Sequence, residues 1–185
     1  MHIASGRFKG MPLIAPPGLR ATEGKVRQAI FNILGEFVEG IRVLDGFAGS
    51  GALGIEALSR GAEFAAFIDA DPDSVIAIRD NLAKLGGELG REHWRVLHLD
   101  ITAGLRELGR QGIQFDLVIL DPPYRSDEGK KALQGVGEYA ILAPAGHLVI
   151  EHDRRSALPS TCGLLSQWKQ HRYGQTVLSF YQATS

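Results

Sequence analysis

The tetrapeptide Asp121-Pro122-Pro123-Tyr124 directly follows an apolar stretch, residues 115–120, whose composition is typical of a strand buried on both faces. Two consecutive prolines impose a rigid extended turn, so the Asp121 carboxylate and the Pro122 carbonyl can present two hydrogen-bond acceptors at fixed positions. Two acceptors on one exocyclic nucleobase amine draw electron density back to nitrogen and orient its lone pair toward a methyl donor. Tyr124 can stack on a base turned out of its helix. We therefore predict that Asp121, Pro122, Pro123 and Tyr124 form a catalytic group for methyl transfer to an amine.

A glycine-rich loop follows an earlier predicted strand that ends at Asp45. Gly49, Gly51 and Gly54 match the dinucleotide fingerprint G-x-G-x-x-G, and the acidic residue Asp69 follows about twenty residues later. In that fingerprint, however, the first glycine follows the strand directly and the helix N-terminus faces a pyrophosphate. Here Asp45 comes first, and its charge would repel a pyrophosphate but attract a cation. The loop therefore favours S-adenosylmethionine, which carries a sulfonium and an ammonium, and a NAD-binding oxidoreductase is the alternative.

The next two predicted strands also end in acidic residues. Asp69 can accept hydrogen bonds from both ribose hydroxyls, and Asp100 can accept one from the adenine amino group while Ile101 packs on the base. Helix capping is the simpler role for each acid considered alone. The candidate cofactor-binding residues are Asp45, Phe47, Gly49, Gly51, Asp69, Ala70, Asp100, Ile101 and Asp121.

The net charge of −1 conceals an uneven distribution. Residues 1–30 carry five basic residues and one acidic residue, whereas residues 31–150 carry 11 basic and 18 acidic residues. A solvated surface is the simple interpretation of the basic cluster, but a local basic arm also allows a nearly neutral protein to hold phosphates. The candidate RNA-binding residues are Arg7, Lys9, Arg20, Lys25 and Arg27.

Strands and helices must alternate to position these residues. Thr22 can cap a first helix that Gly40 ends, and its apolar residues recur at helical spacing. After it, predicted strands at 42–44, 64–68, 96–99 and 115–120 alternate with predicted helices at 52–59, 73–85, 102–109 and 127–137. Alternation of this kind indicates βαβ units and a parallel sheet. Further strands at 147–152, 168–172 and 175–181 leave no room for a helix, so we expect about seven strands with an antiparallel C-terminal hairpin.

Other features limit the class of protein. A length of 185 residues with 44% hydrophobic residues fits one domain with a sizeable core. The single cysteine, Cys162, fits a reducing compartment, and we expect no export signal and no membrane span. The six histidines lack metal-ligand spacing, so we expect no metal. Trp94 and Trp168 are interpreted as packing residues of the core or the sheet edge.

Together these stretches resemble the bacterial 16S rRNA guanine-N2 methyltransferases of the RsmD type over nearly the whole chain. The matching segments are residues 3–10, 22–34, 47–61 and 121–124. The resemblance implies an α/β, Rossmann-like class I methyltransferase fold with a seven-stranded, mostly parallel sheet. It also implies an N-terminal arm, residues 1–24, that helps to hold RNA, followed by a methyltransferase domain at 25–185.

The leading hypothesis is a cytoplasmic, monomeric enzyme that uses S-adenosylmethionine to methylate a guanine N2 of 16S rRNA, as naked RNA or in a small-subunit assembly particle. Because the Asp-Pro-Pro-Tyr motif does not name its base, an amino-group methylase acting on DNA adenine or on tRNA is the nearest alternative. A non-enzymatic RNA chaperone is a third.

Overall fold

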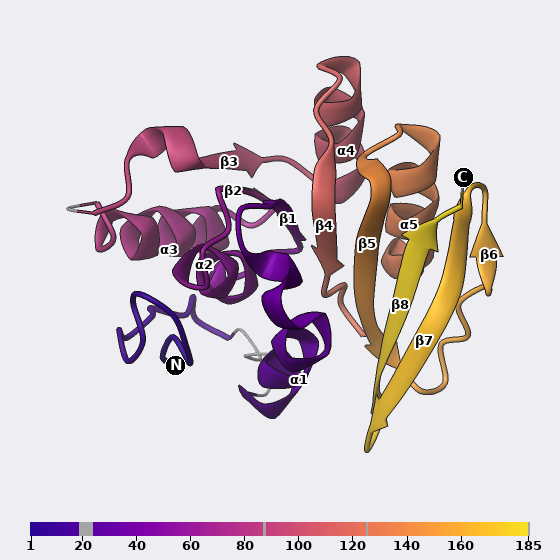
Figure 1. Cartoon of the computed structure of the whole chain (residues 1–185), viewed down its shortest axis with the longest axis horizontal. Helices are drawn as coiled ribbons and strands as arrows, with labels where there is room; N and C mark the ends of the chain where they lie inside the picture. Colours follow the sequence, from indigo (N-terminus) through magenta and orange to yellow (C-terminus); the bar gives the residue numbers. More distant parts are fainter. Residues whose placement is uncertain (19–23, 87, 125, 185) are drawn as a thin grey trace.

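The computed structural model describes residues 1–18, 24–86, 88–124 and 126–184. One eight-stranded sheet with the order β3-β2-β1-β4-β5-β8-β7-β6 forms the centre of the molecule (Figure 1). The first five strands in this order pair in parallel, and β8, β7 and β6 continue the sheet in antiparallel fashion. This arrangement confirms the predicted α/β fold class and the antiparallel C-terminal hairpin.

The elements follow the predicted alternation. The strands are β1 (Arg42–Gly46), β2 (Phe64–Asp69), β3 (Trp94–His98), β4 (Phe115–Leu120), β5 (Leu142–Asp153), β6 (Thr161–Cys162), β7 (Leu165–Tyr173) and β8 (Thr176–Ala183). The helices are α1 (Gly24–Leu34), α2 (Ala52–Ser59), α3 (Pro72–Ala83), α4 (Ile101–Arg110) and α5 (Glu128–Glu138), with 3-10 turns η1 (Gly35–Val38) and η2 (Arg91–His93).

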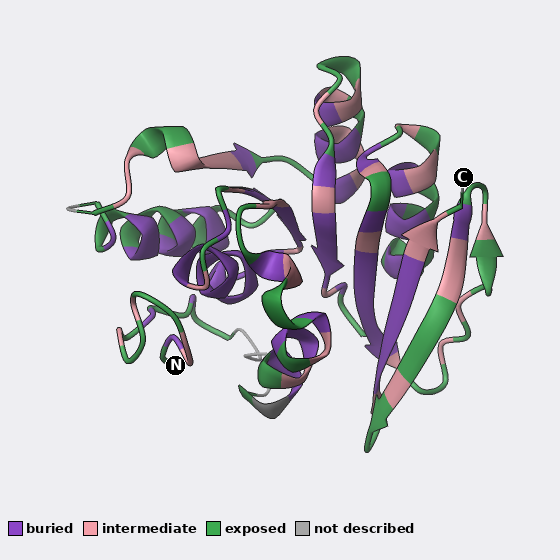
Figure 2. Cartoon of the chain, viewed as in Figure 1, coloured by how far each residue is buried: buried purple, intermediate pink, exposed green. Residues whose placement is uncertain are grey.

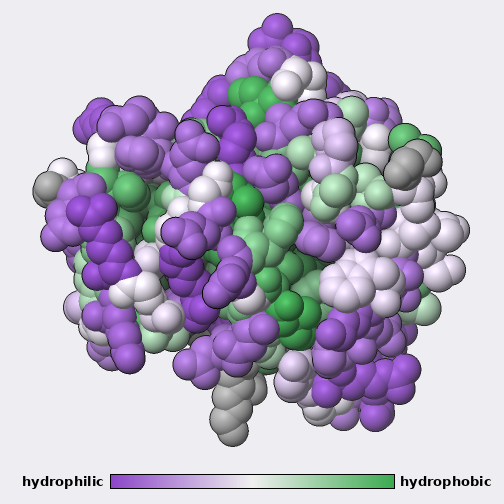
Figure 3. Space-filling model, viewed as in Figure 1, coloured by the Kyte–Doolittle hydropathy of each residue, from purple (hydrophilic) through white to green (hydrophobic). Residues whose placement is uncertain are grey.

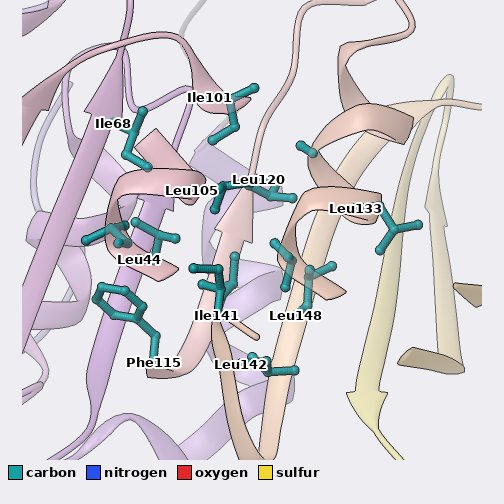
Figure 4. Packing of buried hydrophobic residues seen from close by; sticks show 14 of the residues in the cluster. Leu44, Ile68, Ile101, Leu105, Phe115, Leu120, Leu133, Ile141, Leu142 and Leu148 are labelled. Atoms are coloured by element: carbon teal, nitrogen blue, oxygen red, sulfur yellow. The ribbon is translucent and has the colours of Figure 1, made fainter. Parts of the chain in front are cut away.

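Helices cover both faces of the parallel part of the sheet. Leu105 of α4 and Leu133 of α5 pack on one face against strand residues such as Leu44 and Leu148, all of them buried (Figure 4). The opposite face is covered by α1, α2 and α3 in two further clusters, which include Phe31. Since both faces are covered, the strands can be apolar throughout, and the polar residues at their carboxyl ends remain at one edge.

The N-terminal residues 1–14 pack closely on α2 and α3. The backbone N–H of Ala4 donates to Glu56 Oε2 at 2.7 Å, and Ser59 Oγ donates to the Ser5 carbonyl at 2.6 Å. Asn81 accepts from the Ile14 N–H at 2.8 Å and donates to the Ile14 carbonyl at 2.9 Å. Glu56, Ser59 and Asn81 are all buried, so three side chains inside the domain fix the path of this segment.

The structure differs from the sequence predictions in three places. The first helix ends at Leu34 and continues only as the 3-10 turn η1, because Gly35 adopts φ +57° and breaks the α-helical path before Gly40. The sheet has eight strands rather than seven, since the two-residue strand β6 pairs with the start of β7. The strand predicted at 147–152 is longer, and its pairing with β4 shifts register between Phe115 and Leu117. Thr22, the predicted cap, lies outside the described residues.

The exposed surface is mostly polar. In the space-filling view, hydrophilic side chains cover much of the visible face and apolar surface is exposed mainly near its centre (Figure 3). Among the described residues, no helix is long and apolar enough to cross a membrane.

Candidate functional site

A cleft of about 970 Å³ lies at the carboxyl ends of the parallel strands, where ligands bind in open α/β sheets. Its walls come from the loop after β1, the ends of β2 and β4, the start of α4, and more distant residues of β5 and β8. Of the predicted site residues, those that line it are Phe47, Gly49, Asp69, Ala70, Asp100, Ile101, Asp121, Pro122, Pro123 and Tyr124. The fold therefore brings most of the candidate cofactor and catalytic residues to one space.

The carboxylate of Asp69 binds the backbone of the glycine-rich loop. Gly49 and Gly51 adopt φ +57° and +75°, a region that favours glycine, and Gly51 leads directly into α2. Asp69 Oδ2 accepts from the Gly49 N–H at 2.7 Å, and its Oδ1 accepts from the Asp71 N–H at 2.9 Å. Each carboxylate oxygen has a second lone-pair site, so Asp69 can fix the loop and still accept from hydroxyls in the cleft.

Asp45 lies beneath the loop rather than on the wall of the cleft. It is 1% exposed, and its Oδ2 accepts from the Gly54 N–H near the start of α2 at 2.8 Å. Burial raises the pKa of Asp45 well above its usual range, and the nearby carboxyls of Asp121 and Asp69 raise it further. Asp45 thus supports the loop from beneath through its hydrogen bond to Gly54, and its surroundings favour the neutral carboxyl.

Two other acids cap helices. Asp100 Oδ1 accepts from the Ala103 N–H at 2.9 Å at the start of α4, and the same residue lines the cleft. Asp71 caps α3, and the hydrogen bond from Ser74 is the main reason that its pKa is lowered. Capping and cleft lining are therefore compatible for Asp100.

The Asp121–Tyr124 turn lines another part of the same cleft. The Asp121 N–H donates to the Gly46 carbonyl at 3.3 Å, which ties the turn to the end of β1. The Tyr124 hydroxyl donates to Glu151 Oε1 at 2.7 Å and lies 3.0 Å from Thr176 Oγ1. Burial, more than any other cause, raises the pKa of Tyr124 to about 12. Tyr124 is 44% exposed, but the two contacts of its hydroxyl fix the position of its ring.

Glu151 and Thr176 also line the cleft, and sequence reasoning missed both. Glu151 directly follows the apolar residues 148–150 of β5, is 5% exposed, and belongs to no motif. Its position near the carboxyl end of β5, beside the other strand-end acids, is the signal that could have identified it.

The structure describes the side chains of three of the five predicted RNA-binding cations, and their surroundings differ. Arg7 is exposed and forms an ion pair with Glu88 at 2.7 Å, and Lys9 is exposed. Arg27 differs from the expectation of a solvent-facing cation: it is 4% exposed, because it packs inside the domain and donates to the His2 carbonyl at 2.7 Å. Arg20 and the side chain of Lys25 lie outside the described residues.

The cleft fits a cationic nucleoside rather than a dinucleotide. Its lining includes the carboxylates of Asp69, Asp100 and Asp121, and it is partly lined by apolar atoms of residues such as Ile101. Such a set can neutralise a sulfonium and an ammonium and accept from ribose hydroxyls. Within the described ranges, no cluster of histidine, cysteine and acidic side chains could hold a metal ion.

Comparisons with known proteins agree with this geometry. A family model described as conserved hypothetical protein 95 matches residues 1–182. The Bacillus subtilis protein YlbH, provisionally named an rRNA methyltransferase, is 40% identical over 184 residues, which cover 98% of each chain. The Escherichia coli ribosomal RNA small subunit methyltransferase D is 32% identical over 187 residues, covering 98% of this chain and 89% of its own. The solved structure of Escherichia coli yhhF, provisionally named a methyltransferase, has a TM-score of 0.85 at 30% identity and covers 100% of this chain and 98% of its own.

Proposed function

This chain belongs to the family described as conserved hypothetical protein 95, and we propose that it transfers a methyl group from S-adenosylmethionine to the exocyclic N2 amine of a guanine in 16S rRNA. The observation that carries the proposal is a single cleft in which three strand-end carboxylates and the Asp121–Tyr124 turn face the same space. When bound, S-adenosylmethionine supplies an electrophilic methyl group on a sulfonium. The chain's own residues then supply binding, orientation and acceptors.

On the cofactor side, each acid has a distinct task. Asp69 accepts from the ribose hydroxyls while it fixes the loop through the Gly49 N–H. Asp100 accepts from the adenine amine, and Ile101 packs on the base. Asp45 does not line the cleft; a cofactor ammonium bound above the loop favours its ionised form, and the two interact through a water.

On the target side, the turn orients the amine. The Asp121 carboxylate and the Pro122 carbonyl accept its two N–H groups, which directs the nitrogen lone pair toward the methyl group. Tyr124 stacks on the guanine, and its hydroxyl stays protonated because its pKa is raised to about 12. Asp121 accepts the amine proton only after transfer, when the methylated nitrogen has become acidic.

The substrate is RNA, and we propose that the protein acts as a monomer in the cytoplasm on rRNA or on an assembling small-subunit particle. The DNA adenine, tRNA and dinucleotide alternatives are not favoured by the relatives, which include a small-subunit rRNA methyltransferase. Of the predicted RNA-binding cations, Lys9, Arg20 and Lys25 remain predictions. Arg7 would have to leave Glu88 to contact a phosphate.

Replacing Asp121 tests the proposal. Asp121→Ala should lower transfer of labelled methyl to small-subunit rRNA by at least about 100-fold, because one acceptor for the amine is lost. Calorimetric binding of S-adenosylhomocysteine should persist, and NAD should not bind. Asp127→Ala is the matched control, since Asp127 is an exposed acid outside the cleft that makes no side-chain cap bond to α5.

Three outcomes would contradict the proposal. One is equal loss of transfer and of S-adenosylhomocysteine binding in Asp121→Ala, which would give Asp121 a cofactor role alone. Another is tight binding of NAD by the wild-type protein. The third is a labelled nucleotide other than a guanine when the modified position is mapped.

A further inference from the structure

The strand β7 is the least covered part of the sheet. Figure 2 shows it as largely exposed beside the mostly buried β8. On its outer side, β6 pairs only with Leu165 and Ser166, so within the described part of the chain no strand pairs with the outer edge of residues 169–173. This segment therefore presents both its side chains and its edge to solvent.

Three ring-bearing residues, Trp168, His171 and Tyr173, follow one another along β7, and we call them the aromatic stripe. Trp168 is 46% exposed and Tyr173 is 39% exposed. The Tyr173 ring stacks on His171 with centroids 6.4 Å apart, and the Trp168 ring lies 5.7 Å from the buried Phe180. Rings supported from beneath in this way lose little conformational entropy when a flat ligand covers them.

The aromatic stripe leads to the cleft. In the register of the two strands Tyr173 lies directly opposite Thr176, so these two side chains share one face of the hairpin. Thr176 lines the cleft, and its Oγ1 lies 3.0 Å from the hydroxyl of Tyr124. The exposed rings and the ring proposed to stack on the target base are therefore parts of one continuous surface.

Two exposed cations lie on the same strand. Lys169 Nζ lies 5.7 Å from the centroid of the Trp168 ring, whereas Arg172 lies on the opposite face of β7 from His171 and Tyr173, because side chains alternate along a strand. Both side chains are exposed, and neither forms one of the salt bridges made by the described residues. Aromatic rings interleaved with available cations are the usual composition of surfaces that bind unpaired nucleotides.

We propose that the aromatic stripe, with Lys169, binds the single-stranded RNA that flanks the target guanosine; the identity of that RNA rests on the proposed function. Bases stack on Trp168 and Tyr173, and Lys169 contacts a phosphate. The unpaired edge of β7 is less suited to pairing with a strand of another protein than the exposed rings are to binding RNA. The pairing of β7 with β8 is bulged between Gln167 and Lys169, and both a bulge and exposed cations disfavour pairing with another strand.

The test compares ring removal with ring retention in the full-length protein. In the double variant Trp168→Leu with Tyr173→Leu, which keeps apolar volume, the Kd for labelled oligouridylate should rise about ten- to 100-fold. The KM for rRNA should rise with kcat unchanged, since the stripe lies outside the reacting group. Trp168→Phe with Tyr173→Phe should restore binding. Leu164→Ala, at a residue 70% exposed before β7, is the matched control and should change neither value.

Each result decides the question. An unchanged oligouridylate Kd in the double variant would overturn the inference. A loss of S-adenosylhomocysteine binding in both the double variant and the ring-retaining variant would also overturn it, because misfolding would then explain the effect. If the wild-type protein self-associates and the double variant does not, the surface binds a second copy instead of RNA. If the wild-type protein methylates no rRNA, the proposed function fails, while the oligouridylate measurement still decides the inference.

Discussion

The N-terminal segment, residues 1–14, and the C-terminal ribbon of β7 and β8 border the same cleft through Met1 and Thr176. Buried side chains of α2 and α3 fix the backbone of the N-terminal segment at several points. The ribbon is fixed on one side only, by β5, and β7 leaves its rings and cations exposed. Both regions carry positive charge, but in one of them much of that charge already has a partner inside the protein.

This difference between the two regions affects which basic residues are expected to bind RNA. The basic residues near the N-terminus are the obvious candidates for RNA binding, yet Arg27 is buried and Arg7 pairs with Glu88. Lys169 and Arg172 are fewer but exposed, and Lys169 lies beside the ring of Trp168. Available charge, rather than the number of charged residues in a segment, determines the electrostatic contribution to binding. Four predictions test the comparison.

The largest effect is expected at Gly6, where the N-terminal segment meets α2. Gly6 adopts φ +81°, and a Cβ built there would lie 1.8 Å from the Ser59 carbonyl oxygen. Gly6→Ala should therefore lower the free energy of unfolding by about 3 kcal/mol or more, measured by denaturant titration. Gly10→Ala is the matched control, because Gly10 has φ +87° but nothing within 4 Å of a Cβ. Equal losses in the two variants would show that backbone strain alone, and not the close contact, is responsible.

The next effect is expected at Asn81, which joins the N-terminal segment to the glycine-rich loop. Its Nδ2 donates to the Ile14 carbonyl at 2.9 Å and to the Ser50 carbonyl at 3.0 Å. Asn81→Ala leaves the carbonyl of the buried Ser50 unpaired and removes both bonds to the partly exposed Ile14, so the free energy of unfolding should fall by about 2–4 kcal/mol, and S-adenosylhomocysteine should bind more weakly because Ser50 belongs to the loop. Calorimetry measures both quantities.

Asn81→Asp refines the same prediction. It keeps an acceptor for the Ile14 N–H but places a buried carboxylate against the Ile14 and Ser50 carbonyls, so it should destabilise at least as much as Asn81→Ala. Oligouridylate binding should be unaffected in both variants, since the aromatic stripe makes no contact with α3. A parallel loss of oligouridylate binding would show that the two regions are not independent.

Much of the fold could be predicted because the local signals agree with the tertiary structure. The apolar stretch at 115–120 predicts a strand covered on both faces, and the acids at successive strand ends predict the position of the cleft. The break at Gly35 was not predictable, because the apolar spacing continues through it to Phe37. The short strand β6 depends on a partner in β7 and leaves no pattern of its own.

The site residues divide in the same way. Motif residues such as Asp69 and Tyr124 were predictable from sequence because the chain places them at the ends of strands. The role of Glu151 was not predictable from a motif, since it depends on the contact with Tyr124, 27 residues earlier in the chain. The burial of Arg27 was also not predictable, because the number of cations in a segment does not show whether a given side chain contacts solvent or, like Arg27, the His2 carbonyl.

A smaller effect is expected at Tyr124, whose hydroxyl connects the catalytic turn to the ribbon. Tyr124→Phe keeps the ring but removes the contacts with Glu151 and Thr176, so kcat/KM for rRNA should fall about five- to tenfold. The pKa of Tyr124 is raised to about 12, so the hydroxyl stays protonated through the neutral and mildly alkaline range. The pH profiles of the wild type and the variant should therefore have the same shape. An alkaline decline present only in the wild type would contradict this assignment.

The smallest effect, and the most direct comparison of the two regions, is expected from removing one cation in each. The ion pair of Arg7 with Glu88 has side chains 56% and 58% exposed, and Arg7→Gln should change the free energy of unfolding by less than about 1 kcal/mol. Because that guanidinium already has a carboxylate partner, Arg7→Gln should leave the salt dependence of oligouridylate binding nearly unchanged. Lys169→Gln, which removes an exposed cation beside Trp168, should reduce the slope of log K against log salt by about one. Equal changes in slope would mean that Arg7 exchanges Glu88 for a phosphate, and the N-terminal segment would then share RNA binding with the ribbon.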